Sequence, residues 1–208
     1  LAIVAVKAPQ FSFGRLSGAD PRLGVEMAST GEVGCFGYNA EQALLTALLS
    51  AAFRLPQKNI LFTIGTLEDK LELFPSIRLL ADRGYALFAT ENTHIFLKER
   101  DIPSALVYKI SEPRQPNITE YIKNRRFDLI INIPLHPLSH DRTDGYALRR
   151  LAADSGIPLL TNVQLVKRLI EALIREKPAS LPLLPWPALL LDPPLRTEEP
   201  RATLCAHG

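Results

Sequence analysis

The chain has 208 residues, and this length predicts one domain of ordinary size with a remainder, because a single core usually serves about 100–200 residues. Hydrophobic residues make up 47% and charged residues 22% of the sequence, which is the composition of a globular protein. The formal net charge is +2 with both signs interspersed, so no basic surface for nucleic acid or an anionic membrane is indicated. We therefore expect neither nucleic acid nor a membrane among the partners.

Cysteine and histidine are scarce in this sequence. Cys35, Cys205 and four histidines supply neither a disulfide framework nor a Cys/His zinc site. We expect no metal, and a reducing, cytoplasmic location is the default for such a chain. The sequence opens LAIVAVKAP, without an initiator methionine, a signal peptide or a run of about 18 apolar residues that would span a membrane. We expect it to be a piece of a longer protein.

The first part of the chain, residues 1–37, combines one apolar run with the composition of a loop. Leu1–Val6 is interpreted as a buried strand, and the following residues are rich in Gly, Pro, Ser and Asp, which predicts an irregular loop. A helix is predicted over 40–53, because apolar residues recur there at three- and four-residue spacing and Pro56 ends it. We expect residues 38–57 to connect the first part to the next.

Residues 58–177 repeat one pattern, in which a short apolar run is followed by a polar turn and an amphipathic helix. The runs are apolar at nearly every position, which is typical of parallel strands covered on both faces. Strands are predicted at 59–65, 85–90, 105–109, 127–132 and 157–162. Helices are predicted at 69–83, 93–100, 117–125, 144–155 and 163–176. Five such units predict a three-layer α/β/α fold with a doubly wound, five-stranded parallel sheet.

The last stretch, residues 178–208, contains seven of the 17 prolines. Proline has no N–H to donate, so this density opposes both helix and sheet. We expect a flexible tail, rich in Pro and Leu, that packs weakly against the domain.

Polar residues gather where the predicted strands end. In an open parallel sheet, ligands bind outside the carboxyl ends of the strands, near the point where the winding reverses. Loops favour Asn and Gly in any case, so a purely structural explanation of these ends stays open. The residues concerned are Thr63, Gly65, Thr90, Glu91, Asn92, Thr93, Lys109, Asn132, Thr161 and Asn162.

The segment ATENT runs from a strand directly into a helix. The hydroxyls of Thr90 and Thr93 and the free N–H groups of the first helical turn can therefore converge on one anion. Lys70 and Lys109 are the two cations that this fold could bring to the rim of such a site. The structural alternative is that Thr90 or Asn92 simply caps the helix and that both lysines are solvated.

The sequence offers no convincing catalytic residues. Ser139, His140 and Asp141 are consecutive, so their side chains diverge and cannot form a triad. His94 lies in a predicted helix and His136 in a Pro-flanked loop, where each could line the crevice or be solvated. Neither a glycine-rich phosphate loop nor a carboxylate cluster spaced for a metal occurs. We therefore predict a binding site rather than an active site.

One segment is too specific for a generic loop. GADPRLGVEMASTGEVG (18–34), preceded by KAPQFSF (7–13), resembles the end of the second ATP-grasp unit in the large chain of carbamoyl phosphate synthetase. The α/β part resembles the regulatory domain that follows this unit, a member of the methylglyoxal-synthase-like superfamily. The resemblance covers about residues 1–176. Its other motifs are KNILFTIG, ATENT, DLIINIP and GYALRRLAADSGIPLLTN.

The resemblance implies that residues 1–37 close an ATP-grasp unit and that residues 58–177 bind an allosteric effector at the carboxyl ends of the strands. The family's effector-binding residues match five positions here, and Thr63 is added from the list of strand ends. The candidate effector site therefore comprises Thr63, Lys70, Thr90, Thr93, Lys109 and Asn132. ATP and Mg would bind upstream of Leu1, so no cofactor is implied for this chain itself.

The family's effectors are UMP and IMP in bacteria, UTP and phosphoribosyl pyrophosphate in the animal pyrimidine enzymes, and N-acetylglutamate in the urea-cycle enzymes. Both animal types carry Trp in place of Lys109, so this position is closer to the bacterial arrangement. The urea-cycle enzymes also carry asparagines in place of Leu135 and Gly145. These departures favour a phosphorylated metabolite, such as a uridine nucleotide, over N-acetylglutamate.

The resemblance further implies a role in forming carbamoyl phosphate for pyrimidine or arginine synthesis. The partners would be the rest of the large chain and a glutaminase subunit or domain, in the cytoplasm, or in mitochondria for a urea-cycle type. Two other functions stay open. One is a dimerisation module, since these synthetases self-associate through this end. The other is a lyase like methylglyoxal synthase, although INIPL and RQPNIT lack the acidic residues that such an enzyme needs.

Overall fold

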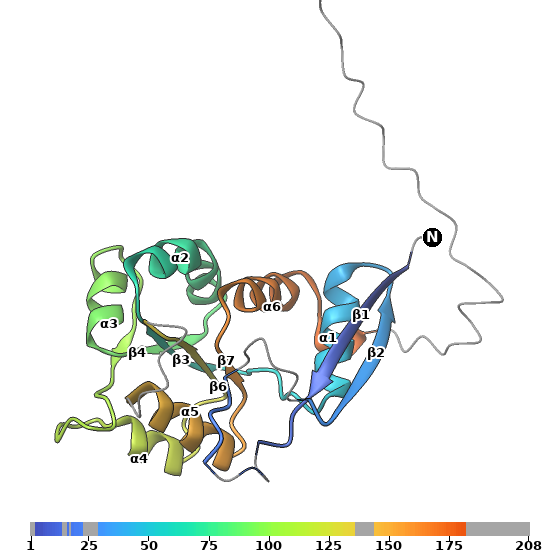
Figure 1. The fold of residues 1–208 in the computed structure, drawn as a ribbon. Helices are drawn as coiled ribbons and strands as arrows, with labels where there is room; N and C mark the ends of the chain where they lie inside the picture. Colours follow the sequence, from blue (N-terminus) through green and yellow to red (C-terminus); the bar gives the residue numbers. More distant parts are fainter. Residues whose placement is uncertain (1–2, 14–15, 17, 23–28, 136–143, 182–208) are drawn as a thin grey trace, which may run out of the picture.

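The structure of the chain is a computed structural model, which describes residues 3–13, 16, 18–22, 29–135 and 144–181. The chain folds into two parts (Figure 1). The smaller part is a two-stranded ribbon beside one helix, and the larger part is a five-stranded sheet between two layers of helices.

The sheet of the larger part has the strand order β5-β4-β3-β6-β7, and every neighbouring pair is parallel. The predicted five-stranded, doubly wound parallel sheet is therefore confirmed. The edge strands β5 and β7 are shorter than their apolar runs. The strands are β3 (Asn59–Ile64), β4 (Ala86–Ala89), β5 (Ala105–Leu106), β6 (Leu129–Ile133) and β7 (Leu159–Leu160).

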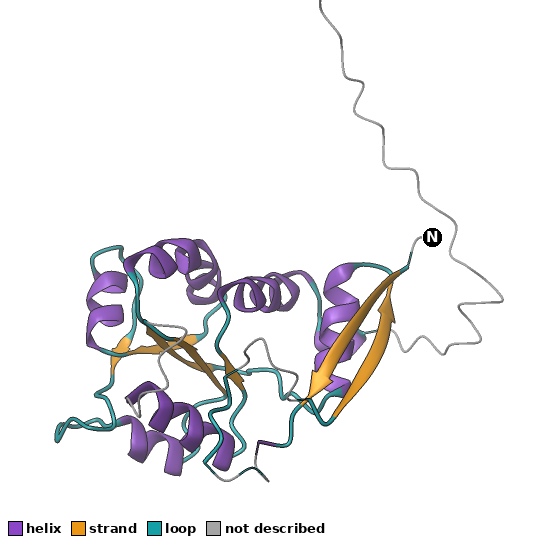
Figure 2. Cartoon of the chain, viewed as in Figure 1, coloured by secondary structure: helices purple, strands orange, loops and turns teal. Residues whose placement is uncertain are grey.

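Helices cover both faces of this sheet (Figure 2), with α2, α3 and α6 on one face and α4 and α5 on the other. Ile60 and Phe62 of β3 belong to the core that packs against α2, α3 and α6. Leu61 between them belongs to the core that packs against α4 and α5. Because both faces are buried, the strand is apolar at successive positions. The helices are α2 (Leu67–Asp82), α3 (Glu91–Lys98), α4 (Ile118–Lys123), α5 (Asp144–Asp154) and α6 (Val163–Arg175).

The N-terminal part differs from the sequence prediction. β1 (Val4–Gln10) pairs antiparallel with β2 (Gly31–Gly37), so a segment that we assigned to an irregular loop forms a strand. The expected buried strand is largely exposed, and Ala8 is the one buried residue of β1. Three glycines in β2 removed the side-chain alternation by which strands are recognised.

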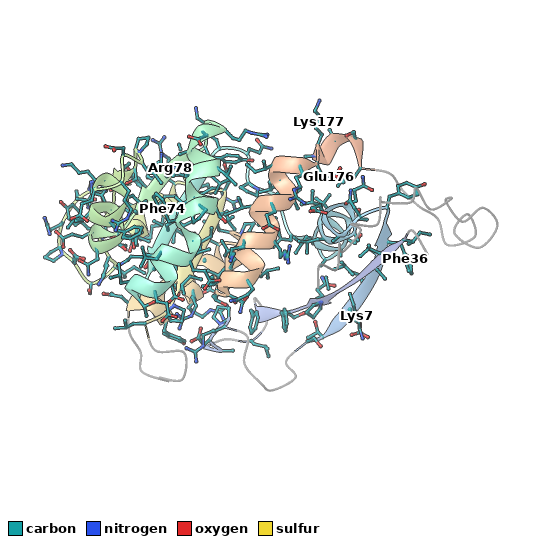
Figure 3. All side chains as sticks on the ribbon, turned by 90° about the horizontal axis from the view of Figure 1, so that it is seen from above. Lys7, Phe36, Phe74, Arg78, Glu176 and Lys177 are labelled. Atoms are coloured by element: carbon teal, nitrogen blue, oxygen red, sulfur yellow. The ribbon has the colours of Figure 1, made fainter. Side chains whose placement is uncertain are left out.

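The ribbon has a single covered face, which explains its exposure. Cys35 of β2 lies on the side of α1 (Ala40–Ser50), where its thiol contacts the Ser50 hydroxyl at 3.5 Å. The opposite side carries an ion pair between Lys7 and Glu32, with 2.7 Å between Nζ and Oε2. Figure 3 shows Lys7 on the side of the ribbon away from the helix.

Helix α1 joins the two parts. Asn39 caps it by accepting from the Gln42 amide, and the Asn39 side chain donates to Glu176 Oε1 just after α6 at 2.8 Å. Leu45 and Leu48 of α1 belong to the core that also contains β3. The predicted helix is thus present, although it ends three residues early, at Ser50 rather than residue 53.

The description of the C-terminal segment ends at Leu181, so most of the expected Pro- and Leu-rich tail lies outside the described residues. Pro178–Ser180 form one 3-10 turn without a buried residue. Leu181 is half-buried against the core that contains β3 and α6.

A chain that ends at Lys177 should be less stable than one that ends at Leu181. Half-burying a leucine is worth about 1 kcal/mol, which corresponds to about 2–4 °C in melting temperature for a chain of this size. Thermal denaturation of the two truncated chains, followed by circular dichroism, measures the difference. Equal melting temperatures would show that the Leu181 contact contributes nothing.

Candidate functional site

The candidate site lies where the winding of the sheet reverses. The chain builds β4 and β5 on one side of β3 and then returns to place β6 on the other side. Ligands in open α/β sheets bind outside the strand ends at this point. A cavity of about 410 Å³ lies here, and its lining includes the ends of β3, β4 and β6.

Four of the six predicted effector-binding residues line this cavity, namely Thr63, Thr90, Lys109 and Asn132. Lys70 and Thr93 are not among the lining residues. The topology has therefore brought together residues from four separate strand ends, while the role of each in binding stays a prediction.

Thr90 occupies the N-cap position of α3, but its side chain makes no capping hydrogen bond. The residue is 6% exposed and lines the cavity together with Glu91 and Asn92 of the first helical turn. The first N–H groups of a helix have no partner within it. Thr90 therefore has the backbone position of an N-cap residue. Its hydroxyl makes no capping bond and can bond to another donor or acceptor.

Thr93 has a different position from Thr90. It is 1% exposed, and its hydroxyl accepts a hydrogen bond from the Ile64 amide at 3.2 Å. This contact ties the first turn of α3 to the last residue of β3. The structure thus gives Thr93 a structural partner below the cavity.

Asn132 and Gly65 shape the wall where β3 and β6 end. Asn132 lies opposite Thr63 in the parallel register and is 3% exposed. A Cβ atom on Gly65 would lie 2.5 Å from the Leu135 backbone, so a larger residue would push away the segment that follows β6. Glycine at this position therefore lets the two strand ends close one side of the cavity.

The segment after β5 forms a further wall. Lys109 is exposed and lines the cavity, and its backbone N–H donates to Glu112 Oε1 at 3.3 Å. The Ser111 hydroxyl donates to Asp144 Oδ2 at 2.7 Å, which fastens this segment to the start of α5. Glu112 and Asp144 both line the cavity, as does Glu91. The lining therefore contains carboxylates as well as cations.

Lys70 lies in the first turns of α2 and is 8% exposed. Burial lowers the pKa of Lys70 below the ordinary value for lysine. No described residue forms a hydrogen bond or an ion pair with the Lys70 ammonium group. A buried cation of this kind would be favoured by an anion that came close to it, but the structure does not place it in the cavity wall.

Sequence reasoning missed two arginines of the site, Arg22 and Arg149. Arg149 is 3% exposed, and its guanidinium contacts Asn132 and Asp20. A signal was present in the sequence, because Arg149 lies beside Leu148 and three residues before Ala152, on the apolar side of α5. An arginine among apolar positions indicates a buried partner.

The sequence also singled out His94, His136 and the run Ser139, His140 and Asp141. His94 Nδ1 lies 2.9 Å from the Ser104 hydroxyl and does not line the cavity. His136, Ser139, His140 and Asp141 lie outside the described residues. Within the described ranges, no group of three His, Cys, Asp or Glu side chains is placed to hold a metal ion. In the same part of the chain, no helix has the length and apolar character needed to cross a membrane.

Comparison with known protein families identifies the family of the α/β part. A family model described as MGS-like domain matches residues 72–161. The chain contains an MGS-like domain. The matched region covers the predicted and observed strand ends from β4 to β7, and the resemblance to the methylglyoxal-synthase-like superfamily is confirmed.

The chain is also similar to parts of much larger proteins. It is 48% identical over 183 residues to "Multifunctional protein pyr-3" of Neurospora crassa, covering 84% of this chain and 10% of that protein. It is 42% identical over 185 residues to "Multifunctional protein CAD" of Squalus acanthias, covering 82% and 8%. It is 42% identical over 179 residues to human "Carbamoyl-phosphate synthase (ammonia), mitochondrial", covering 84% and 12%.

The chain thus spans about a tenth of the length of these relatives. The resemblance to the carbamoyl phosphate synthetase family is confirmed by these matches. The assignment of residues 1–37 to an ATP-grasp unit stays a prediction.

Replacing Thr93 with valine should destabilise the MGS-like domain. The variant keeps the shape of the side chain but leaves the buried Ile64 amide without its acceptor, which costs about 1–3 kcal/mol. Chemical denaturation measures this loss. Thr93→Ser retains the hydroxyl and serves as the control, and equal stability of both variants would contradict a structural role for that hydroxyl.

The lowered pKa of Lys70 predicts a dependence of stability on alkaline pH. The unfolded chain binds the Lys70 proton more tightly than the folded chain, so the contribution of this residue to stability improves as pH rises toward 10.5. Lys70→Met should therefore melt above the parent chain at neutral pH, by a margin that shrinks near pH 10. Lys98→Met, at an exposed position of α3, should show no such trend. A lower melting temperature for Lys70→Met at neutral pH would mean that the ammonium has a stabilising partner.

Proposed function

We propose that this chain is the effector-binding regulatory region of a carbamoyl phosphate synthetase and that its cavity binds a phosphorylated metabolite, foremost a uridine nucleotide. One observation supports this most. Thr90, whose hydroxyl makes no capping bond, lines one cavity together with the first turn of α3 and Lys109. A helix N-terminus with hydroxyl and ammonium donors suits a phosphate group.

The size and remaining lining of the cavity agree with a nucleotide. Its volume of about 410 Å³ falls within the usual range for small-ligand sites, about 300–1,000 Å³. Ile110, Ile118 and Leu148 supply apolar surface for a base. The carboxylates of Glu112 and Asp144 can accept hydrogen bonds from sugar hydroxyls and base N–H groups.

The same lining is less suited to N-acetylglutamate. A dicarboxylate needs a cationic or N–H donor group at each end, whereas three carboxylates share this cavity with the cations. Leu135 and Gly145 both line the cavity at the positions where the resemblance would require asparagines for this ligand. Neither residue offers the amide that such a site would use.

The role of the site in the larger protein follows from linkage. An effector that binds one arrangement of the domain more tightly than another can shift the activity of the attached synthetase by at most that difference, typically about 1–3 kcal/mol. The synthetase would hold ATP and Mg upstream of Leu1 and receive ammonia from a glutaminase. The names of the relatives support carbamoyl phosphate formation, in pyrimidine synthesis for the multifunctional proteins, as the activity that is regulated.

Replacing Lys109 with alanine should weaken the binding of phosphorylated effectors. Loss of a charge-assisted contact costs about 1.5–3 kcal/mol, and each 1.4 kcal/mol is about a factor of ten in affinity. The measurement is a calorimetric titration of the 208-residue chain with UMP, UTP, IMP, phosphoribosyl pyrophosphate and N-acetylglutamate. Lys98→Ala changes an exposed lysine of α3 that does not line the cavity and is the matched control.

Binding should also weaken as ionic strength rises, because Lys109 is exposed to the screening ions. Unchanged binding of every phosphorylated effector to Lys109→Ala would overturn the proposed anion site. Binding of N-acetylglutamate alone would replace the phosphorylated effector with the amino-acid derivative.

A further inference from the structure

A segment from the connection between β1 and β2 lies across α5, beside the cavity. We call its described residues, Phe13, Leu16 and 18–22, the strap. The Tyr146 hydroxyl donates to the Gly18 carbonyl at 2.8 Å. The Arg150 guanidinium donates to the carbonyls of Phe13, Leu16 and Ala19 at 2.9, 3.1 and 2.9 Å. Helix α5 therefore holds the backbone of the strap. Arg22, at the end of the strap, lines the cavity.

One side chain of the strap reaches a buried cation of the cavity wall. Asp20 accepts two hydrogen bonds from Arg149, at 2.7 Å from Nε and 2.6 Å from the terminal nitrogen Nη2. The other terminal nitrogen of Arg149 donates to Asn132 Oδ1 at 2.8 Å. An arginine side chain is always charged in proteins. Arg149 is 3% exposed, so its guanidinium needs these acceptors. The Arg149 guanidinium thus donates hydrogen bonds both to the strap and to the end of β6.

This contact fixes which way the Asn132 side chain is turned. A guanidinium can only donate, so the Asn132 atom that faces it must be the carbonyl oxygen. The amide NH2 group of Asn132 then remains for the cavity, next to Thr63 in the register of β3 and β6. Without Arg149, the side chain could turn by 180° and present its oxygen, which would repel an anionic or acceptor group.

We propose that Asp20, Arg149 and Asn132 couple docking of the strap to occupancy of the cavity. Asp20 holds Arg149, and Arg149 orients the Asn132 amide as a donor toward the ligand. Arg149 and Asp20 are positioning residues in this arrangement, and Asn132 is the group that contacts the ligand. The inference rests on the proposed function, because it takes an acceptor-rich ligand such as a phosphorylated metabolite as the occupant.

The coupling has a definite sign. A docked strap strengthens ligand binding, and by linkage a bound ligand must stabilise the docked strap to the same degree. If the ligand instead competed with Asp20 for Arg149, binding would release the strap. The two signs are distinguished by removing the charge of Asp20 while keeping its size.

The test uses the 208-residue chain, UMP as the probe and the variant Asp20→Asn. We expect roughly tenfold weaker binding of UMP by calorimetry, equivalent to about 1.4 kcal/mol. Arg149→Lys should weaken binding similarly, because an ammonium cannot serve Asp20 and Asn132 in the fixed fork geometry. Asp82→Asn is the matched control, since it alters an exposed aspartate at the end of α2 that lies outside the strap and does not line the cavity.

Amide hydrogen exchange supplies a readout that loss of packing alone would not change. UMP should slow the exchange of residues 18–22 in the parent chain and in Asp82→Asn, and it should have no such effect in Asp20→Asn. Circular dichroism confirms that each variant is folded.

Three outcomes separate this inference from the proposed function. If the parent chain binds UMP and Asp20→Asn binds it equally or more tightly, the coupling is overturned while the effector site stands. Faster exchange of the strap on addition of UMP also overturns the coupling, in favour of competition. If the parent chain binds no phosphorylated compound, the proposed function fails and the coupling fails with it.

Discussion

The central position of β3 decides where this protein can hold a ligand. It pairs in parallel with β4 on one side and with β6 on the other, so that three carboxyl ends meet at one edge of the sheet. Thr63 lies opposite Asn132 in this register, and the Thr90 amide donates to the Phe62 carbonyl at 3.3 Å. The helices that follow β3 and β6 leave toward opposite faces. The chain therefore diverges above these strand ends, and the cavity occupies the space between the departing segments.

The parts of the fold that were predictable from the sequence are those in which local pattern and burial agree. Strands covered on both faces are apolar at successive positions, so β3 and β6 were found within two residues of their observed bounds. β2 was missed because its glycines carry no alternation and half of the ribbon is exposed. At the site, topology alone brings Thr63, Thr90 and Asn132 together, and the strand ends therefore sufficed to find them. Asp20 and Arg149 are 129 residues apart, and no local pattern encodes a contact over that separation.

The two threonines of ATENT lie in different surroundings. Thr90 at the N-cap has its hydroxyl at the cavity, and Thr93, one helical turn further, has its hydroxyl on the Ile64 amide. Thr93 can still affect a ligand through the backbone. It fixes the end of β3, and Gly65 directly after this end touches the segment that carries Leu135. Loss of the Thr93 hydroxyl would therefore loosen two walls of the cavity together, even though Thr93 lines neither.

Arg149 makes the MGS-like domain dependent on residues outside its family boundaries. The matched region, 72–161, contains Arg149 and Asn132 but not Asp20, which lies in the strap. A guanidinium that is 3% exposed is costly to leave without a carboxylate partner. The acceptor therefore has to come with the strap, which is held in turn by Arg150 and Tyr146 of the same helix. The strap and the α/β part are thus one energetic unit, although one segment precedes the other in sequence and only the second is recognised as a domain.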